Sequence, residues 1–266
     1  MKPVNKTLYI PLYGKACVSR KGILLRDPKA EEIWEKEGFA LRGKAASRWL
    51  AYYMSMRAVV FDRWVCRRLE ESPDAVVLHI GCGLDSRALR VGGEALWYDI
   101  DFPEVISQRG QFFPETGNYR MLGTDVRQEN WLETIPPKET AIVVMEGVSM
   151  YLQPRECSAL LDALGSRFRR VWLLMDSYTT FAAKASRYKN PINEVGVTRV
   201  WGMDDPRTAA EGTPLCFTEE LDMTPAELVK QLPGWEQAVF RRLFAGAAAK
   251  KLYRLYEYRS EIPGNA

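Results

Sequence analysis

The chain has a single histidine and no surplus of charge of either sign. With 37 lysines and arginines against 34 acidic residues, the 266-residue sequence has a formal net charge of +3. A balanced charge predicts no broad basic face, so nucleic acid is not expected as a partner. Because His79 lies within an apolar run, we expect it to be a core residue, which excludes serine–histidine hydrolases. A multi-histidine metal site is also excluded, since zinc needs three or four nearby ligands.

Long apolar runs and paired cysteines are missing too. No stretch approaches the roughly 18 apolar residues of a membrane span, and the first residues hold no apolar segment typical of a secretion signal. The cysteines form no C-x-x-C pair and leave an odd one, which favours reduced thiols. These are Cys17, Cys66, Cys82, Cys157 and Cys216. We therefore expect a cytoplasmic protein with no membrane partner.

One short segment combines a buried strand with a glycine turn. Residues 75–87 read AVVLHIGCGLDSR, in which apolar residues are followed by Gly81, Cys82 and Gly83. The two glycines lack a Cβ, so the backbone can turn sharply and a ligand can lie against it. A helix that begins near Asp85 would direct its free N–H groups towards that ligand. The segment is typical of a nucleotide-cofactor loop.

Acidic residues end the strands that follow. We expect the second strand to run into Asp99 and Asp101, about 20 residues beyond the first glycine, where a βαβ unit presents a carboxylate to ribose hydroxyls. Later strands are expected to end at Asp125, Glu146 and Asp176. Because the carboxyl ends of parallel strands share one edge of a sheet, the pattern predicts an α/β fold. Its sheet would be open, mostly parallel and Rossmann-like, with a polar site at that edge.

The segments around the sheet have different patterns. Residues 1–72 have apolar residues at helical spacing and predict a helical cap over the cofactor. Residues 73–266 form the predicted cofactor-binding domain, in which residues 184–215 have turn chemistry and predict a lid. Thr224-Pro-Ala-Glu227 has the form of a capping box and predicts the start of a helix. Residues 247–258 fit either an amphipathic helix or a pair of strands.

Several motifs together resemble one family of methyltransferases. The resemblance is to the leucine carboxyl methyltransferase superfamily, and within it to the polyketide O-methyltransferases of the tetracenomycin type. It spans about residues 8–180 and implies a class I methyltransferase that uses S-adenosylmethionine (SAM). The motifs are Ile10-Pro-Leu-Tyr-Gly-Lys-Ala16, Gly81-Cys-Gly-Leu-Asp-Ser-Arg87, Tyr98-Asp-Ile-Asp-Phe-Pro-Glu104, Gly123-Thr-Asp125 and Glu146-Gly-Val-Ser-Met-Tyr-Leu152.

The resemblance implies residues that bind the methionine and ribose portions of SAM. Arg57 matches the arginine that holds the methionine carboxylate, a task suited to a planar guanidinium. Gly81 and Gly83 would lie beneath the methionine and the ribose. Asp101, the acid of the Asp-Phe-Pro motif, matches the ribose ligand because a carboxylate can accept from both hydroxyls. Asp99 is the competing choice for this role.

The remaining matched positions surround the adenine and the reacting methyl group. Asp125 would accept a hydrogen bond from the adenine amino group while Val126 covers the ring. Glu146 lies where the family places an acid that faces the methionine amine or the neighbouring pocket. Tyr151 would stand at the pocket mouth near the methyl group and is the candidate catalytic residue.

The acceptor is constrained mainly by the lack of a histidine base. Methylation of a neutral hydroxyl usually needs a base near neutral pH, whereas a carboxylic acid is already an anion. The sequence therefore favours an acidic oxygen, either a carboxylate or an easily ionised phenol. The acceptor would be a small metabolite such as a polyketide, or a peptide or protein carboxylate. Lys15 and Arg199 are the cations expected to receive an anionic substrate.

Two other functions also fit the glycine loop. NAD(P)-dependent oxidoreductases use Gly-x-Gly and an acid about 20 residues further on. Their fingerprint requires a third glycine or an alanine, and Ser86 occupies that position here. A methyltransferase-like binding module without activity is the second alternative, and it is disfavoured because every matched cofactor position is filled.

Overall fold

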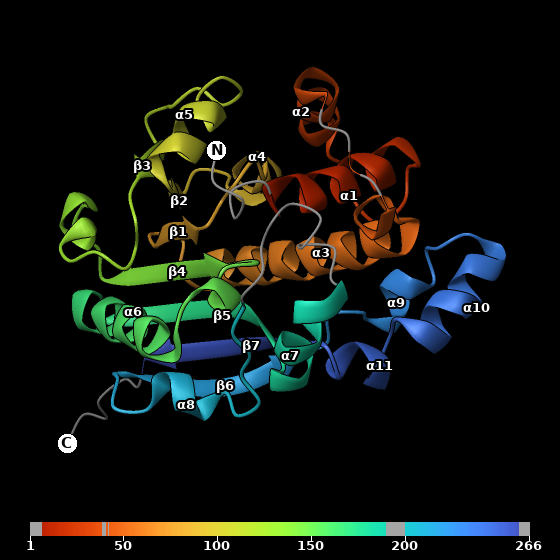
Figure 1. Cartoon of the computed structure of the whole chain (residues 1–266). Coiled ribbons are helices and arrows are strands. Elements are labelled where there is room, and N and C mark those ends of the chain that lie inside the picture. The colour runs from red at the N-terminus through yellow and green to blue at the C-terminus, as the bar shows by residue number, and fades with distance from the viewer. Residues whose placement is uncertain (1–6, 39–40, 42, 190–199, 261–266) are drawn as a thin grey trace.

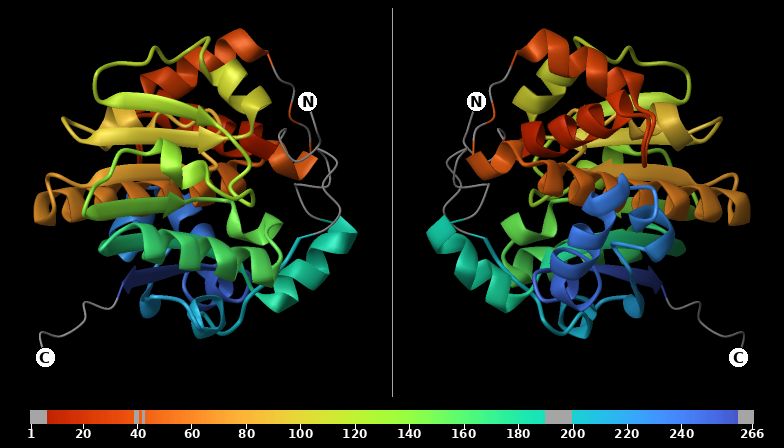
Figure 2. Two further views of the ribbon diagram at one scale, coloured as in Figure 1. Left: turned by 90° about the vertical axis from the view of Figure 1, so that its left-hand side faces the viewer. Right: turned by 90° about the vertical axis from the view of Figure 1, so that its right-hand side faces the viewer.

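The computed structural model describes residues 7–38, 41, 43–189 and 200–260. Their strands join in one sheet with the order β3-β2-β1-β4-β5-β7-β6, and helices cover both of its faces (Figures 1 and 2). Strands β1 to β5 are parallel, and β7 runs antiparallel to both of its neighbours. This confirms the predicted open, mostly parallel, Rossmann-like sheet.

The strands are β1 (Val76–Ile80), β2 (Leu96–Asp101), β3 (Tyr119–Gly123), β4 (Thr140–Met145), β5 (Arg170–Tyr178), β6 (Leu215–Leu221) and β7 (Tyr253–Ser260). The α-helices are α1 (Tyr9–Arg20), α2 (Pro28–Glu37), α3 (Arg48–Glu71), α4 (Arg87–Val91), α5 (Pro103–Arg109), α6 (Pro154–Arg167), α7 (Thr180–Lys189), α8 (Arg207–Ala210), α9 (Ala226–Val229), α10 (Gly234–Leu243) and α11 (Ala247–Lys250). Short 3₁₀ turns are η2 (Gly43–Ala46), η3 (Trp131–Thr134) and η4 (Ser149–Tyr151).

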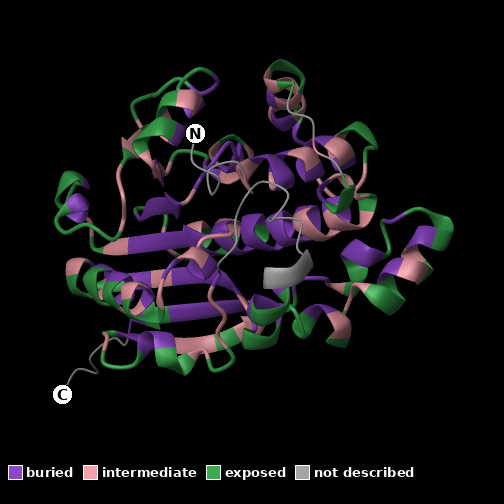
Figure 3. Cartoon of the chain, in the orientation of Figure 1, coloured by how far each residue is buried: buried purple, intermediate pink, exposed green. Residues whose placement is uncertain are grey.

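The central strands are buried on both faces, which explains their continuous apolar sequences. Successive side chains alternate between the faces, so Val77 and Leu174 pack in the cluster that contains α3, while Val76 and Leu173 pack in the cluster that contains α6. Figure 3 shows the central strands and the sheet-facing side of α3 as buried, whereas the outer strand β6 is largely intermediate. The sheet is therefore a rigid support for the residues at its carboxyl edge.

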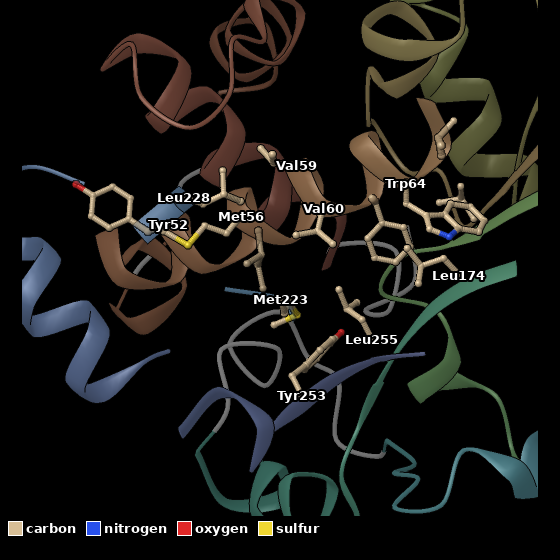
Figure 4. Packing of buried hydrophobic residues seen from close by; sticks show 14 of the residues in the cluster. Tyr52, Met56, Val59, Val60, Trp64, Leu174, Met223, Leu228, Tyr253 and Leu255 are labelled. Carbon is tan, nitrogen blue, oxygen red and sulfur yellow. The ribbon is translucent and has the colours of Figure 1, made fainter. Parts of the chain in front are cut away.

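Helix α3 belongs to the same hydrophobic core as the sheet. Its buried residues Tyr52, Met56 and Trp64 belong to one hydrophobic cluster with Leu174 of β5 and Leu255 of β7, and Trp64 lies beside Leu174 in Figure 4. The predicted helical character of this segment is confirmed, and α3 ends at Glu71, just before Ser72 and Pro73. The division of the chain into a cap and a cofactor-binding domain at residue 72 stays a prediction. Helix α3 belongs to the predicted cap, yet its side chains share a hydrophobic cluster with the sheet.

Several element boundaries differ from the sequence prediction, and β3, for example, ends at Gly123, two residues before Asp125. Helix α4 begins at Arg87, two residues later than expected, because the Asp85 N–H bonds to the Cys82 carbonyl in a turn. Strand β5 continues through Asp176 to Tyr178, because the buried Asp176 carboxylate accepts from Arg57 inside the protein. The carboxylates therefore point from strand ends and strand interiors alike.

The C-terminal region contains both kinds of element that its sequence allowed. Residues 247–250 form α11, and β7 then pairs with β5 and β6. The capping box at Thr224 does not form: Pro225 is the N-cap of α9, and the Thr224 hydroxyl instead accepts from the N–H of Gly246 at 3.2 Å. That bond ties the start of α9 to the segment before α11.

The predicted lid is described only in part. Residues 190–199 lie outside the described residues, and Arg199 with them. The remainder comprises the end of α7, then α8 and the start of β6, and the bridge between Tyr178 and Gly202 holds it against β5. The lid role stays a prediction. Among the described helices, none combines the length and apolar character needed to cross a bilayer.

Candidate functional site

A cavity of about 850 Å³ opens at the carboxyl edge of the sheet, where β1, β2 and β4 end. This volume lies in the range of small-molecule and cofactor sites. The cavity brings together the predicted cofactor and substrate residues that the structure describes. They are Lys15, Arg57, Gly81, Gly83, Asp101, Asp125, Val126, Glu146 and Tyr151.

The glycine loop turns as the sequence predicts. Gly81 has φ +70° and Gly83 has φ +51°, values that favour glycine. A Cβ on Gly81 would lie 2.2 Å from Cγ2 of Val148, so only glycine allows the loop after β4 to approach so closely. The two loops therefore form one continuous floor of the cavity.

The structure distinguishes between the two candidate ribose acids. Asp101 lines the cavity and accepts from the backbone N–H groups of Gly83 and Phe102, both at 2.8 Å. Burial raises its pKa despite these two donors. Asp99 is fully buried and is held by four side chains, those of His79, Trp97, Arg109 and Tyr119. This geometry favours Asp101 as the ribose ligand, a role that stays a prediction.

Arg57 lies at the centre of a buried ion-pair cluster. Its Nε donates to Glu146 at 3.0 Å, and its Nη1 donates to Asp176 at 2.7 Å and to the Tyr253 hydroxyl at 3.0 Å. Its Nη2 faces Gly147, 3.7 Å from where a Cβ on that glycine would stand. The predicted contact with a methionine carboxylate would use this face of the guanidinium.

The two acids of this cluster respond differently to burial. Burial opposes the charge on Glu146, but Arg57 and Arg87 outweigh it and lower the pKa of Glu146 to about 2. Burial raises the pKa of Asp176. Arg57 lowers this pKa, but repulsion by the charge of Glu146 raises it further, so the net shift is upward. Glu146 therefore keeps its negative charge at the cavity wall, where the ammonium group of a ligand could pair with it.

Lys15 is a buried cation rather than a surface one. It is 2% exposed and lies 3.0 Å from Asp85, the acid in the glycine-loop motif. Arg90 contacts the same Asp85 oxygen at 2.9 Å. Lys15 is thus already paired inside the protein, and its role toward an anionic substrate stays a prediction.

The rest of the cavity lining is mostly apolar and aromatic, and we call this part the apolar end. Tyr151 lies there, and burial raises its pKa, so its hydroxyl stays protonated near neutral pH. Val126 packs beside the sheet, and Asp125 is paired with Arg127 at the cavity wall. The apolar end includes Pro11, Trp49, Leu50, Tyr53, Tyr178, Leu243, Phe244, Leu252 and Tyr253.

Tyr53 is a cavity residue that the sequence reasoning missed. Its buried hydroxyl has no hydrogen-bond partner among the described residues. Buried hydroxyls are nearly always satisfied, so this orphan points to a bound ligand as its partner. Its position one helical turn before Arg57 on α3 was the available signal, because residues four apart share a helix face. Tyr253 was also missed, and the position of Asp176 inside β5 was not predicted, since their contacts with Arg57 join segments distant in sequence.

The residues present fit the parts of SAM. Asp101 at the glycine loop matches a ribose diol, and Glu146 matches an ammonium group. Arg57 matches a carboxylate, and Val126 offers an apolar surface for a ring. The fold and this site together define the class of Rossmann-like SAM-dependent methyltransferases.

Comparison with known proteins identifies the family. The sequence profile described as Leucine carboxyl methyltransferase matches residues 10–165. The chain is 33% identical over 225 residues to the tetracenomycin polyketide synthesis O-methyltransferase TcmP of Streptomyces glaucescens, a match that covers 83% of each protein. It belongs to the leucine carboxyl methyltransferase family and is a SAM-dependent methyltransferase.

One further relative and one solved structure are similar to the chain. The S-adenosyl-L-methionine-dependent methyltransferase dpfgK of Gibberella zeae is 31% identical over 182 residues, which are 62% of this chain and 60% of that protein. The magnesium protoporphyrin IX methyltransferase of Synechocystis PCC 6803, solved with bound S-adenosylhomocysteine (SAH), has a TM-score of 0.52 at 13% identity. That match covers 87% of this chain and 93% of the other, and it shows that the fold is shared.

Proposed function

We propose that this protein is an O-methyltransferase that methylates an oxygen already ionised when it binds, either a carboxylate or an acidic phenol, on a small apolar metabolite. One observation carries the proposal: the tyrosines of the apolar end are poor bases. Burial raises the pKa of Tyr53, Tyr151 and Tyr253, so all three stay protonated at neutral pH. They can donate hydrogen bonds to an anion but cannot readily remove its proton.

Glu146 and His79, which also line the cavity, are unsuited to act as a base. Glu146 is held as an anion by two arginines, with a pKa of about 2. His79 lines the cavity, but both of its ring nitrogens are engaged, Nδ1 with Asp99 at 3.0 Å and Nε2 with Arg87 at 3.2 Å. An acceptor that arrives as an anion removes the need for such a base.

In this proposal the cofactor lies along the carboxyl edge of the sheet. Arg57 binds the methionine carboxylate and Glu146 the amine, while Gly81 and Gly83 leave room for the chain. Asp101 binds the ribose hydroxyls. Asp125 and Val126 bind the adenine at the adjoining wall. When bound, SAM supplies a methyl group that its positively charged sulfur makes electrophilic.

The acceptor would occupy the apolar end of the cavity. Tyr53 and Tyr151 donate hydrogen bonds to its ionised oxygen and hold it in line with the methyl group. Lys15, which lines the cavity, supplies positive charge for an anionic acceptor. Holding the reactants in place and excluding water can together lower the activation barrier by roughly 7–11 kcal/mol. Positioning is the main task left to the protein when no proton has to be moved.

An apolar small molecule is favoured over a peptide carboxylate. Aromatic and aliphatic side chains dominate this end of the cavity, whereas a peptide would require partners for its backbone amides. The name of the relative TcmP refers to polyketide synthesis, which agrees with a small aromatic acceptor. An oxidoreductase would need a site for nicotinamide, and we infer none.

The test is a panel of acceptors that share one ring system. The purified protein is incubated with SAM and 2-naphthoate, 2-naphthol or 2-naphthylmethanol, and methylated products are identified by mass spectrometry. We expect methyl ester from the carboxylate, slower ether formation from the phenol and no product from the alcohol. Ether formation should be slower because the phenol, with a pKa of about 10, is mostly neutral near pH 7. Methylation of the alcohol in preference to the carboxylate would contradict the proposal.

The cofactor is tested separately by calorimetric titration. The protein should bind SAH and should not bind NADH. Binding of NADH instead of SAH would support the oxidoreductase alternative. Binding of SAH without turnover of any acceptor by the protein would support the non-catalytic module.

A further inference from the structure

A chain of buried polar side chains runs along the cavity wall, across the carboxyl ends of β4, β1 and β2. It starts at Glu146, which Arg87 contacts through Nη2. Arg87 Nη1 lies 3.2 Å from His79 Nε2, and His79 Nδ1 lies 3.0 Å from Asp99. Asp99 in turn accepts from Arg109. Every member of this chain is buried.

The chain ends on the glycine loop. Arg109 Nη1 donates to the carbonyl oxygen of Gly83 at 3.0 Å. Burial disfavours charge on Asp99, but Arg109 and His79 outweigh burial and lower the pKa of Asp99 to about 2. The Gly83 N–H donates to Asp101 at 2.8 Å. The two ends of the chain are thus the acid proposed for the amine of SAM and the loop that carries the proposed ribose acid.

The directions of these hydrogen bonds are fixed by chemistry. A guanidinium has only donors, so His79 Nε2 must accept from Arg87. The imidazole proton is then on Nδ1, where it is donated to the ionised Asp99. His79 can make both bonds only in this tautomer.

Arg87 occupies the branching point of the network. It is fully buried, and its Nε donates to Asp62 of α3 at 2.7 Å while Nη1 and Nη2 reach His79 and Glu146. No single lysine amine can reproduce this planar fork across three partners. Arg87 itself is not part of the cavity lining, so any effect on the ligand must pass through its partners.

We propose that Arg87 is a positioning residue that fixes Glu146 and, through His79, Asp99 and Arg109, the Gly83 loop in one relative arrangement. It thereby sets the spacing between the groups that hold the amine and the ribose of SAM. This inference rests on the proposed cofactor roles of Glu146 and Asp101. It deepens them by assigning the spacing to a residue that does not touch the ligand.

The variants are chosen to separate positioning from general stability. Arg87→Lys should weaken SAH binding at least tenfold. Arg90→Lys is the matched control on the same helix: Arg90 is buried among Asp62, Asp85 and Asp27, but it contacts neither Glu146 nor His79. It should lower the melting temperature and leave the dissociation constant for SAH close to that of the wild type.

Two variants of the histidine test transmission along the chain. His79→Gln can accept from Arg87 and donate to Asp99, so it should keep SAH affinity near the wild-type value. His79→Leu removes both bonds and should weaken SAH binding. Equal affinity of both variants, with Arg87→Lys also binding as the wild type does, would overturn the positioning role.

The wild-type protein gives a readout that needs no variant. Since the chain has one histidine, a long-range ¹H–¹⁵N spectrum reports only His79. We expect a protonated Nδ1 and an unprotonated Nε2 that accepts a hydrogen bond. A spectrum with the proton on Nε2 would show that Arg87 does not donate to His79, and the inference would fail. Failure of wild-type protein to bind SAH would instead refute the cofactor site itself.

Discussion

Replacement of Asp101 by alanine tests the cofactor site most informatively. Its carboxylate lines the cavity and is the proposed acceptor for the ribose hydroxyls. Loss of a charged hydrogen-bond partner costs about 1–3 kcal/mol, which corresponds to a weakening of about 5- to 150-fold in the dissociation constant for SAH. Isothermal titration calorimetry measures this change directly.

The same carboxylate also anchors the loop, so a control is needed. Asp101 accepts from the N–H groups of Gly83 and Phe102 as well as from a ligand. Asp204→Ala removes a similar bond, to the N–H of Thr180 at 2.9 Å, away from the cavity, and should leave SAH affinity unchanged. Asp101→Asn keeps one acceptor oxygen without charge and should bind SAH with intermediate affinity. An Asp101→Ala variant that binds SAH as tightly as the wild type would refute the assignment.

Three further predictions follow from the cavity. Arg57→Lys should lose most SAH affinity in calorimetry, because one ammonium cannot hold the acids and the ligand carboxylate in a fork; unchanged binding would contradict its role. Leu243, which is 58% exposed at the cavity lining, should be covered by the acceptor, so Leu243→Ser should raise the acceptor KM severalfold and leave the SAM KM unchanged. Leu89→Ser, also exposed but away from the cavity, should change neither constant, and equal effects of both variants would refute the acceptor site. Because the pKa of Glu146 is depressed in the folded state, its contribution to stability should be present above about pH 4.5 and be lost as pH falls towards 2. Urea unfolding at several pH values gives the free energy of unfolding, which should rise less steeply with pH in this window for Glu146→Gln than for the wild type. An identical dependence on pH in both proteins would contradict the depressed pKa.

The sheet could be predicted because each of its central strands is recognisable from its own residues. Runs such as residues 76–80 and 141–145 are apolar, short and followed by glycine or acid, a pattern that only buried parallel strands require. The family motifs located the cavity residues for the same reason, since they stand at the ends of these strands.

What the sequence could not show depends on contacts between distant segments. The acids within strands, such as Asp99 and Asp176, are stabilised by arginines from other elements, so local polarity suggested that strands end where they continue. Residues 247–258 contain a helix and a strand because β7 finds partners on both sides. The orphaned hydroxyl of Tyr53 could be recognised only once its surroundings were known.

The central claim, that the acceptor oxygen is ionised before methyl transfer, is tested most directly by the pH dependence of kcat/KM with two acceptors. For a carboxylate the rate should be nearly flat from about pH 6 to 8, since its pKa is near 4. For a phenol the rate should rise with pH, with its midpoint at the pKa of the phenol itself. That midpoint should move to lower pH when a more acidic phenol is used. A common midpoint near neutral pH for both acceptors would show that a group of the protein acts as a base, and would contradict the account.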